Sequence, residues 1–313
     1  MLDILARHRY YIASLLALCC FPCGTTFAAD DAPVDFTVQL DVVKQELDPG
    51  FCWFHPRVAA IPGAGQDGQP LVILTLQKHL AADDHYSGLY FMLTKDLGKT
   101  WSGPTLPKEL DWQPGENNET IAVCDATPGW HAPSKKVIVI GTRLRYSKSG
   151  AQLMDQPRSH DFAYALFDPA QGAWTTWRQF DMPRGDDGRF HQVAPGCVQW
   201  LVKDDGTMLV PVYYQGPKDG PYSATVVHCA FDGTTLKYLA HGDELQLNVV
   251  RGLAEPSIAR FGGKYYLTLR NDVRGYVTVS DDGLKYAPLK PWTFDDGQDL
   301  GSYDTQQHWV PHR

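Results

Sequence analysis

Residues 94–101 read TKDLGKTW, and this segment decides the fold that the sequence predicts. It directly follows an apolar run over 88–93 that is typical of a β-strand. The side chain of Asp96 can accept hydrogen bonds from backbone N–H groups two residues on, and Gly98 can adopt a backbone conformation that other residues resist. Trp101 can then pack the turn onto its own sheet. The segment therefore predicts a tight β-hairpin, opened by Thr94.

Similar turns recur further along the chain. Residues 280–286 read SDDGLKY, with Ser280, Asp282 and Gly283 at the matching places and Tyr286 where the first copy has tryptophan. This copy is one residue shorter between the aspartate and the glycine. A more divergent copy, DPAQGAW, occupies 168–174. All three follow strand-like runs, so we interpret them as the same turn in successive sheets.

The turns belong to an internal repeat of about 60 residues. Each unit holds three apolar segments, which we expect to be strands: 55–62, 71–76 and 88–93; 120–124, 136–140 and 162–167; 196–201, 208–212 and 224–228; 256–261, 264–269 and 276–279. A fifth unit opens at 305–310, and 35–47 predicts one lead-in strand. Short strands between turn clusters indicate an all-β fold, and repeated four-stranded sheets favour a β-propeller. A β-sandwich, or two sandwiches, is the main alternative.

The repeat also predicts that the propeller is incomplete. Four blades and the start of a fifth are present, and a propeller closes by pairing its first and last blades. We therefore expect the 313 residues to be a fragment, truncated after the start of blade five.

The N-terminal segment is typical of a signal peptide. Arg7 and Arg9 precede an apolar stretch over 11–21 that is too short to span a bilayer. Small residues near Ala28 and Ala29 suit cleavage. We predict a signal peptide over 1–29, a lead-in segment over 30–49 and a propeller over 50–313. The mature protein should have no membrane span and be secreted or periplasmic.

Composition excludes some classes of partner and site. A formal charge of −8 without a Lys/Arg run argues against nucleic acid. No CxxC or HExxH pattern occurs in the mature chain, and the scattered His55, His85, His191 and His308 are expected in packing or substrate contacts, so no metal is predicted. Four cysteines remain in the mature chain: Cys52, Cys124, Cys197 and Cys229. They are expected to be buried free thiols, with one disulfide as the alternative.

The turn motif and the repeat together resemble the sialidase (neuraminidase) superfamily, whose Asp-box or BNR-repeat proteins are six-bladed β-propellers. This resemblance covers roughly residues 50–313. It implies a glycoside hydrolase of the exo-α-sialidase type without a cofactor. In that family three arginines hold the substrate carboxylate, an aspartate is the acid/base, and a tyrosine paired with a glutamate is the nucleophile.

The resemblance also implies site residues. Arg57, in the segment HPRVAAIP over 55–62, resembles the first carboxylate-binding arginine, although its following proline comes later than usual. Asp84 matches the acid/base loop of the first blade, with Asp83 and His85 as neighbouring substrate contacts. Two adjacent carboxylates can raise one pKa, which suits a general acid.

The fourth unit gives the best match. Glu255 opens it, and Arg270 ends the next predicted strand 15 residues later, as in the family. Glu255 is predicted to act as a base on a tyrosine, and Arg270 to bind the substrate carboxylate by a two-pronged contact. The nucleophilic tyrosine and the third arginine would lie beyond Arg313.

Three functions remain open. The first is a secreted exo-glycosidase that removes terminal sialic acid or a related acidic sugar from glycans. The second is a hydrolase of another acidic polysaccharide. The third is a non-catalytic propeller of the same fold that binds a glycan or a protein. Fold by itself does not choose among them.

Overall fold

The computed structural model describes residues 37–80, 84–153, 162–216, 220–301 and 305–311. The chain divides into residues 1–42 and 43–313. In the first part only 37–42 is described, and these residues are exposed and form neither helix nor strand. The predicted signal peptide therefore lies outside the described residues. No helix among the described residues is long and apolar enough to cross a membrane.

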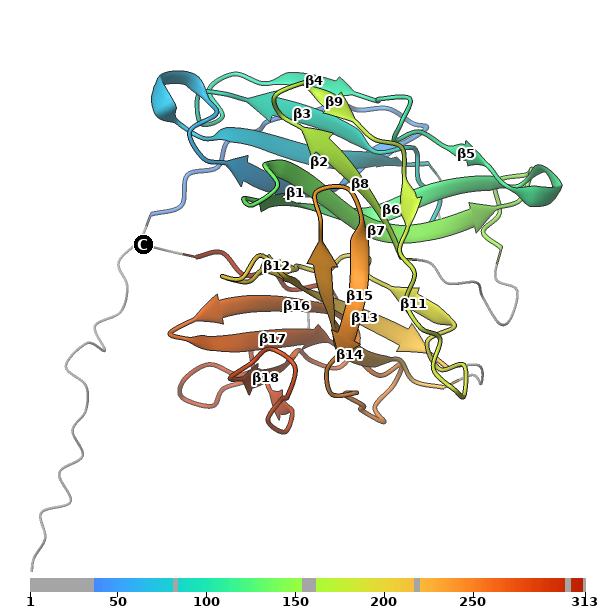
Figure 1. The fold of residues 1–313 in the computed structure, drawn as a ribbon, viewed down its shortest axis with the longest axis vertical. Coiled ribbons are helices and arrows are strands. Elements are labelled where there is room, and N and C mark those ends of the chain that lie inside the picture. The colour runs from blue at the N-terminus through green and yellow to red at the C-terminus, as the bar shows by residue number, and fades with distance from the viewer. Residues whose placement is uncertain (1–36, 81–83, 154–161, 217–219, 302–304, 312–313) are drawn as a thin grey trace, which may run out of the picture. The chain divides into compact units, whose positions relative to one another are not determined.

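Residues 43–313 contain four antiparallel sheets that follow one another along the chain, which confirms the predicted all-β propeller arrangement with four blades (Figure 1). The first sheet has the order β1-β2-β3-β4 and the second the order β10-β8-β7-β6-β5, with β9 also pairing with β8. The strands of these two blades are β1 (Cys52–Ile61), β2 (Leu71–His79), β3 (Tyr90–Thr94), β4 (Ser102–Thr105), β5 (Gln113–Pro114), β6 (Thr120–His131), β7 (Lys136–Tyr146), β8 (Phe162–Asp168), β9 (Ala173–Trp174) and β10 (Arg178–Gln179). Short 3₁₀ turns, η1 (Gln66–Gly68) and η2 (Glu116–Asn118), precede β2 and β6.

The third and fourth sheets repeat the pattern with the orders β11-β13-β14-β15 and β16-β17-β18-β19, and β12 also pairs with β13. Their strands are β11 (Gln192–Ala194), β12 (Leu201–Val202), β13 (Met208–Gln215), β14 (Ser223–Phe231), β15 (Leu236–His241), β16 (Ala254–Phe261), β17 (Lys264–Arg270), β18 (Tyr276–Ser280) and β19 (Lys290–Pro291). Most predicted strand positions thus coincide with strands of the structure.

Three predicted strands are wrong. Residues 37–47 form no strand, because no neighbouring strand pairs with them and Val38, Leu40 and Leu47 are more than 80% exposed. In the third blade the predicted strand over 196–201 coincides with an interruption between β11 and β12. Residues 305–311 are not in a strand: the backbone N–H of Trp309 donates to the side-chain oxygen of Gln199, at 2.6 Å, rather than to a strand.

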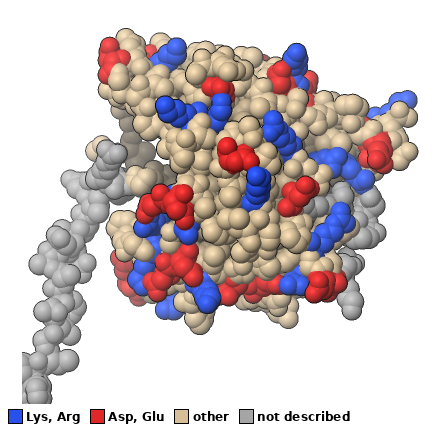
Figure 2. All heavy atoms as spheres, in the orientation of Figure 1, with Lys and Arg blue, Asp and Glu red and all other residues tan. Residues whose placement is uncertain are grey.

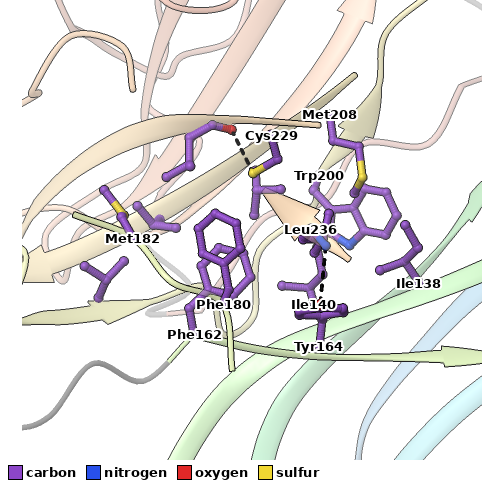
Figure 3. Close-up of a cluster of buried hydrophobic side chains, with 14 of the residues drawn as sticks. Ile138, Ile140, Phe162, Tyr164, Phe180, Met182, Trp200, Met208, Cys229 and Leu236 are labelled. Carbon is purple, nitrogen blue, oxygen red and sulfur yellow. Dashed lines mark hydrogen bonds between the residues drawn. The ribbon is translucent and has the colours of Figure 1, made fainter. Parts of the chain in front are cut away.

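The sheets pack face to face through apolar side chains, and alternation along single strands explains how. In β7, Val137 and Val139 belong to the apolar cluster shared with the first blade, whereas Ile138 and Ile140 belong to the cluster shared with the third. Successive residues of a strand point to opposite faces, so a sheet buried on both faces has a continuous apolar sequence. Figure 3 shows the cluster between blades two and three, where the indole of Trp200 joins the same core.

The turn over 94–101 has a dense hydrogen-bond network. Asp96 accepts the backbone N–H of Thr100 at 2.9 Å and the hydroxyl of Thr100 at 2.6 Å. The Thr94 hydroxyl donates to Asp96 at 2.8 Å and accepts the N–H of Gly98 at 2.8 Å. Gly98 has φ of +87°, and an added Cβ there would contact the ring of Trp101, which packs over the turn.

The other three blades have related turns. In the fourth, Asp282 accepts two backbone N–H groups at 2.8 Å, and the Ser280 hydroxyl accepts the N–H of Gly283. In the second, Asp168 accepts the N–H of Ala170 at 2.9 Å. The third-blade turn was not predicted from the sequence: there Asp232 accepts backbone N–H groups of two threonines at 3.0 and 2.8 Å. Figure 2 shows acidic and basic side chains interspersed on the face of the molecule that it presents.

Asp96→Ala is expected to lower Tm by about 2–6 °C, because the hydrogen bonds to Asp96 hold the hairpin closed. Those from Thr100 and Thr94 lower the pKa of Asp96 to about 2. A carboxyl group with a lowered pKa stabilises the fold when the pH is above its ordinary pKa. That stabilisation is lost as the pH falls through the lowered pKa. The Tm difference measured by circular dichroism should therefore shrink between about pH 5 and pH 2. Lys95→Ala, at an exposed neighbour, is the control, and equal Tm values for all three proteins would contradict this role.

Candidate functional site

The first strand of each blade is distorted at the same place. The pairing register of β1 shifts between Phe54 and Arg57, that of β6 between Cys124 and Thr127, and that of β16 between Ala254 and Ser257. The third blade has a longer form of the same interruption, between β11 and β12. Bulges of this kind redirect side chains and are common next to active sites.

A non-glycine residue with positive φ occupies each distortion. The φ angles are 49° at His55, 58° at Asp125, 56° at Cys197 and 45° at Glu255. Such left-handed conformations cost on the order of 1–3 kcal/mol each and cluster at functional sites. Four blades therefore carry the same backbone conformation at equivalent positions, each with a different chemical group.

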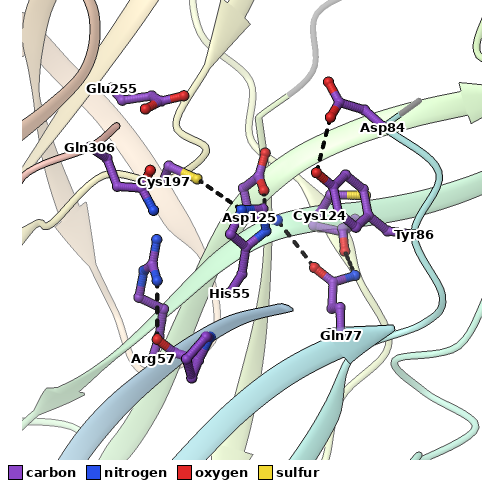
Figure 4. Close-up of polar contacts among 12 residues, drawn as sticks. His55, Arg57, Gln77, Asp84, Tyr86, Cys124, Asp125, Cys197, Glu255 and Gln306 are labelled. Atoms are coloured by element: carbon purple, nitrogen blue, oxygen red, sulfur yellow. Dashed lines mark hydrogen bonds and ion pairs between the residues drawn. The ribbon is translucent and has the colours of Figure 1, made fainter. Parts of the chain in front are cut away.

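All four side chains line one cavity of about 490 Å³. Figure 4 shows several of these polar groups and the blades from which they come. The cavity is also lined by carboxylate, guanidinium, phenol and hydroxyl groups, namely those of Asp84, Arg251, Arg270, Tyr86, Tyr213, Tyr222 and Thr142. Its lining is therefore mostly polar and includes several acids and phenols.

Glu255 and Arg270 form a largely buried ion pair in this cavity. One guanidinium nitrogen of Arg270, Nη1, donates to both carboxylate oxygens of Glu255, each at 2.8 Å. Their side chains are 14% and 16% exposed. The bulge explains the contact, because Ala254 pairs with Arg270 across the strands and Glu255 follows directly. The structure thus pairs these two residues with each other, whereas their predicted roles, as a base on a tyrosine and as a binder of a substrate carboxylate, remain predictions.

The cavity changes the proton affinity of its acids. Burial raises the pKa of Glu255, and the opposing effect of Arg270 does not cancel it. Burial raises the pKa of Tyr213 well above its ordinary value, and the charge of Glu255 raises it further. Tyr213 and Tyr222 pack edge to face, with ring centres 5.4 Å apart. A carboxylate with a raised pKa is a stronger base, and a phenol of the same cavity lies within its electrostatic influence.

A second group of side chains lies beside this pair. His55 Nδ1 is 2.6 Å from Asp125 Oδ1, and His55 Nε2 is 3.8 Å from Cys197 Sγ. The backbone N–H of Cys197 donates to the carbonyl of Asp125 at 3.0 Å, which ties blade three to blade two. Burial raises the pKa of the Cys197 thiol well above its ordinary value, and Asp125 and Glu255 add to that rise.

The residues expected for acid/base work lie in different surroundings. Asp84 lines the cavity and accepts the hydroxyl of Tyr86 at 3.0 Å. Asp83 lies outside the described residues. His85 does not line the cavity; its ring stacks on Trp112 with centres 5.8 Å apart, and burial lowers its pKa.

Arg57, expected to bind a carboxylate, is half-buried and is not among the side chains that line the cavity. Its Nη1 donates to the carbonyl of Pro56 at 3.0 Å. Nε and Nη2 are buried without a hydrogen-bond partner in the described part of the chain. The guanidinium therefore retains capacity for an anion.

Sequence reasoning missed several groups of the cavity: His55 and Cys197 as a cluster with Asp125, and Tyr213 with Arg251. The aligned starts of the four repeat units could have indicated His55, Asp125, Cys197 and Glu255 as equivalent positions. The four cysteines are free thiols, as expected. Three of them are buried, but Cys52 is exposed, so the expected burial was wrong for Cys52. Arg251 Nε lies 2.7 Å from Asp272 at the cavity wall.

No protein-family model matches this sequence, and no curated protein matches it in sequence. Comparison with solved structures gives clear matches. A Trypanosoma rangeli sialidase bound to a difluoro-KDN is 15% identical with a TM-score of 0.54, over 75% of this chain and 36% of that one. The protein NanB, bound to Optactamide, is 12% identical with a TM-score of 0.53, over 82% of this chain and 53% of that one.

A third match has a different activity. An N-acetylgalactosamine deacetylase from F. plautii, bound to blood group B trisaccharide, is 11% identical with a TM-score of 0.50, over 82% of this chain and 73% of that one. These likenesses show the fold, a propeller of the kind found in sialidases and other carbohydrate-active enzymes. The chain spans between about a third and a half of the length of the sialidases that it matches, from 36% to 53%.

Proposed function

We propose that this protein is a glycoside hydrolase that removes a terminal acidic sugar, sialic acid or a close relative, from glycans outside the cytoplasm. One observation carries the proposal: a buried Glu255 held by Arg270 faces a polar cavity at the bulged first strands of the blades. The sialidase-type fold is consistent with it. Arg270, Arg251 and the nearby Arg57 supply the positive charge that a sugar carboxylate requires.

The proposed chemistry has two steps. Glu255 accepts the phenol proton of Tyr213, and the phenolate oxygen attacks the anomeric carbon while Asp84 protonates the leaving oxygen. Water, deprotonated by Asp84, then cleaves the tyrosyl–sugar bond, and the proton on Glu255 returns to Tyr213. A tyrosine nucleophile is neutral until it loses its proton, so it avoids the repulsion that a carboxylate nucleophile would have with an anionic sugar. Tyr213 is assigned this role, in place of a tyrosine beyond Arg313, because it lines the same cavity as Glu255. Its pKa is raised, so its proton must pass to Glu255 as the oxygen attacks.

The alternative is a propeller that binds an acidic glycan without cleaving it. Arg270 engages both oxygens of Glu255, and a carboxylate held in this way can serve to join two strands instead of accepting a proton. Binding without turnover would then be the complete activity of the cavity.

The chain is expected to release 4-methylumbelliferone from an α-sialoside, measured by fluorescence, and to leave the matching β-galactoside intact. A β-glucuronide separates recognition of sialic acid from recognition of any carboxylated sugar. Saturation-transfer NMR with free sialic acid gives binding independently of turnover. Binding without release would favour the binding module, and neither binding nor release of any acidic sugar would overturn the proposal.

A further inference from the structure

We propose that His55, Asp125 and Cys197 form a binding site for a divalent transition-metal ion, with zinc the best fit. The proposal goes beyond the glycosidase function and does not rest on it. Their donor atoms all lie within 4.8 Å of one another at the wall of the central cavity. The three residues come from three blades and adjoin one another in Figure 4.

The donor set suits zinc. Imidazole nitrogen, carboxylate oxygen and thiolate sulfur are the three ligand types that zinc takes in proteins, and catalytic sites use three of them with a fourth position open. Bonds of about 2.0–2.3 Å place two ligands of one tetrahedral zinc about 3.3–3.7 Å apart. One donor atom from each of the three residues lies within 4.8 Å of the other two, so a modest contraction would bring them to that separation. A hard ion such as Mg²⁺ would instead require a set made only of oxygens.

His55 and Asp125 lie within ion-pair distance of each other, but their contact lacks hydrogen-bond geometry. Although Nδ1 and Oδ1 are 2.6 Å apart, both atoms are buried and, within the described ranges, neither has a hydrogen bond of acceptable direction. Buried polar atoms in native proteins are nearly always paired. An ion between the imidazole and the carboxylate would satisfy both, after a small widening of that contact.

Thr142 provides an independent observation at the same site. Its side chain is 6% exposed, and its hydroxyl has no hydrogen-bond partner among the residues that the structure describes. This hydroxyl lines the same cavity and lies with the Asp125 Cβ against Gly196, where an added Cβ would be 2.5 Å from Oγ1 and 3.0 Å from that carbon. A water on the open coordination position could hydrogen-bond to it.

The backbone and the charge of the site also suit an ion. All three ligands have left-handed φ, and an ion would offset the strain of holding them at one point. A thiolate and a carboxylate contribute two negative charges, which match a divalent cation. The open position would face the cavity that holds Glu255, where it could take water or a sugar oxygen.

The test is titration of the chelator-treated chain with Co²⁺, which replaces zinc and reports its ligands by absorption. We expect saturation at one equivalent, a thiolate-to-cobalt charge-transfer band in the near ultraviolet and the strong visible bands of a four-coordinate ion. Cys197→Ser should abolish the near-ultraviolet band, and His55→Ala or Asp125→Asn should weaken binding by about 100-fold or more. Zinc should displace cobalt and raise the Tm of the wild-type chain.

Cys52→Ser is the matched control, because it removes an exposed thiol by the same substitution. It should keep the full band and the zinc-induced rise in Tm, and far-ultraviolet circular dichroism verifies the fold of each variant. Absence of saturable one-to-one binding by the wild type would overturn the proposal. A band that disappears in Cys52→Ser but persists in Cys197→Ser would overturn it too. Since none of these readouts involves a sugar, they can fail while glycoside hydrolysis is retained.

Discussion

Arg270→Met is expected to lower the free energy of unfolding by about 3–5 kcal/mol at neutral pH, the usual cost of removing one partner of a buried ion pair. The loss arises because the carboxylate of Glu255 stays buried without the guanidinium that donates to both its oxygens. Urea unfolding monitored by tryptophan fluorescence measures it. A change below about 1 kcal/mol would mean that the pair behaves as a solvated surface pair.

The stability difference between Arg270→Met and the wild type should depend on pH. The pKa of Glu255 is already raised by burial, and removing Arg270 should raise it further. A group with a raised folded-state pKa stabilises the fold below its unfolded pKa, and that stabilisation is lost as pH rises through the folded pKa. The gap between Arg270→Met and wild type should therefore close as the pH falls toward and below 4.5, the ordinary value.

Two further variants separate the missing charge from the missing packing. Arg270→Lys keeps the charge and should lose less stability than Arg270→Met. The double variant Glu255→Gln/Arg270→Met removes both charges and should recover part of the loss. A double variant that is as unstable as the sum of the two single ones would show that packing, not charge, accounts for the loss.

Glu255→Gln is expected to lower kcat on the sialoside by about 10²–10⁴-fold while leaving binding of free sialic acid largely unchanged, because the amide keeps the size of the side chain but cannot accept a proton. Steady-state kinetics and saturation-transfer NMR give the two quantities. Tyr213→Phe should lower kcat to a similar degree, since the phenol oxygen is the proposed nucleophile.

Arg270→Lys should instead raise KM, because a lysine cannot reproduce the two-pronged contact with a carboxylate.

Tyr222→Phe is the control for Tyr213→Phe, since Tyr222 packs against Tyr213 and lines the same cavity. If Glu255→Gln keeps the wild-type kcat, Glu255 and Arg270 only hold two strands together. That result would favour a propeller that binds without cleaving.

The fold could be predicted because its determinants are local. The strand, the turn at Asp96 and the next apolar run are neighbours in sequence, and their chemistry specifies a hairpin without distant contacts. Where a segment depends on distant residues, prediction failed. Residues 305–310 have strand-like composition, yet Trp309 pairs with the side chain of Gln199, far away in sequence.

The same distinction between local and distant contacts holds for the site. Glu255 and Arg270 lie on paired strands of one sheet, so their contact follows from sequence spacing. His55, Asp125 and Cys197 belong to three different blades, and only an alignment of the repeat units, not any local motif, marks them as equivalent. Their positive φ is also hard to read from the sequence, because histidine and aspartate are only enriched in that conformation and cysteine is not.

The four equivalent bulges have a consequence for how this protein could change its chemistry. Each blade offers one position where the backbone shape is constant and the side chain is not: imidazole, carboxylate, thiol and a longer carboxylate. These four positions share one backbone conformation and line one cavity, so the chemical group can differ while the local backbone stays the same. A library randomised at only His55, Asp125, Cys197 and Glu255 would thus vary the chemistry of the cavity, with stability lost in the variants where Glu255 no longer pairs with Arg270.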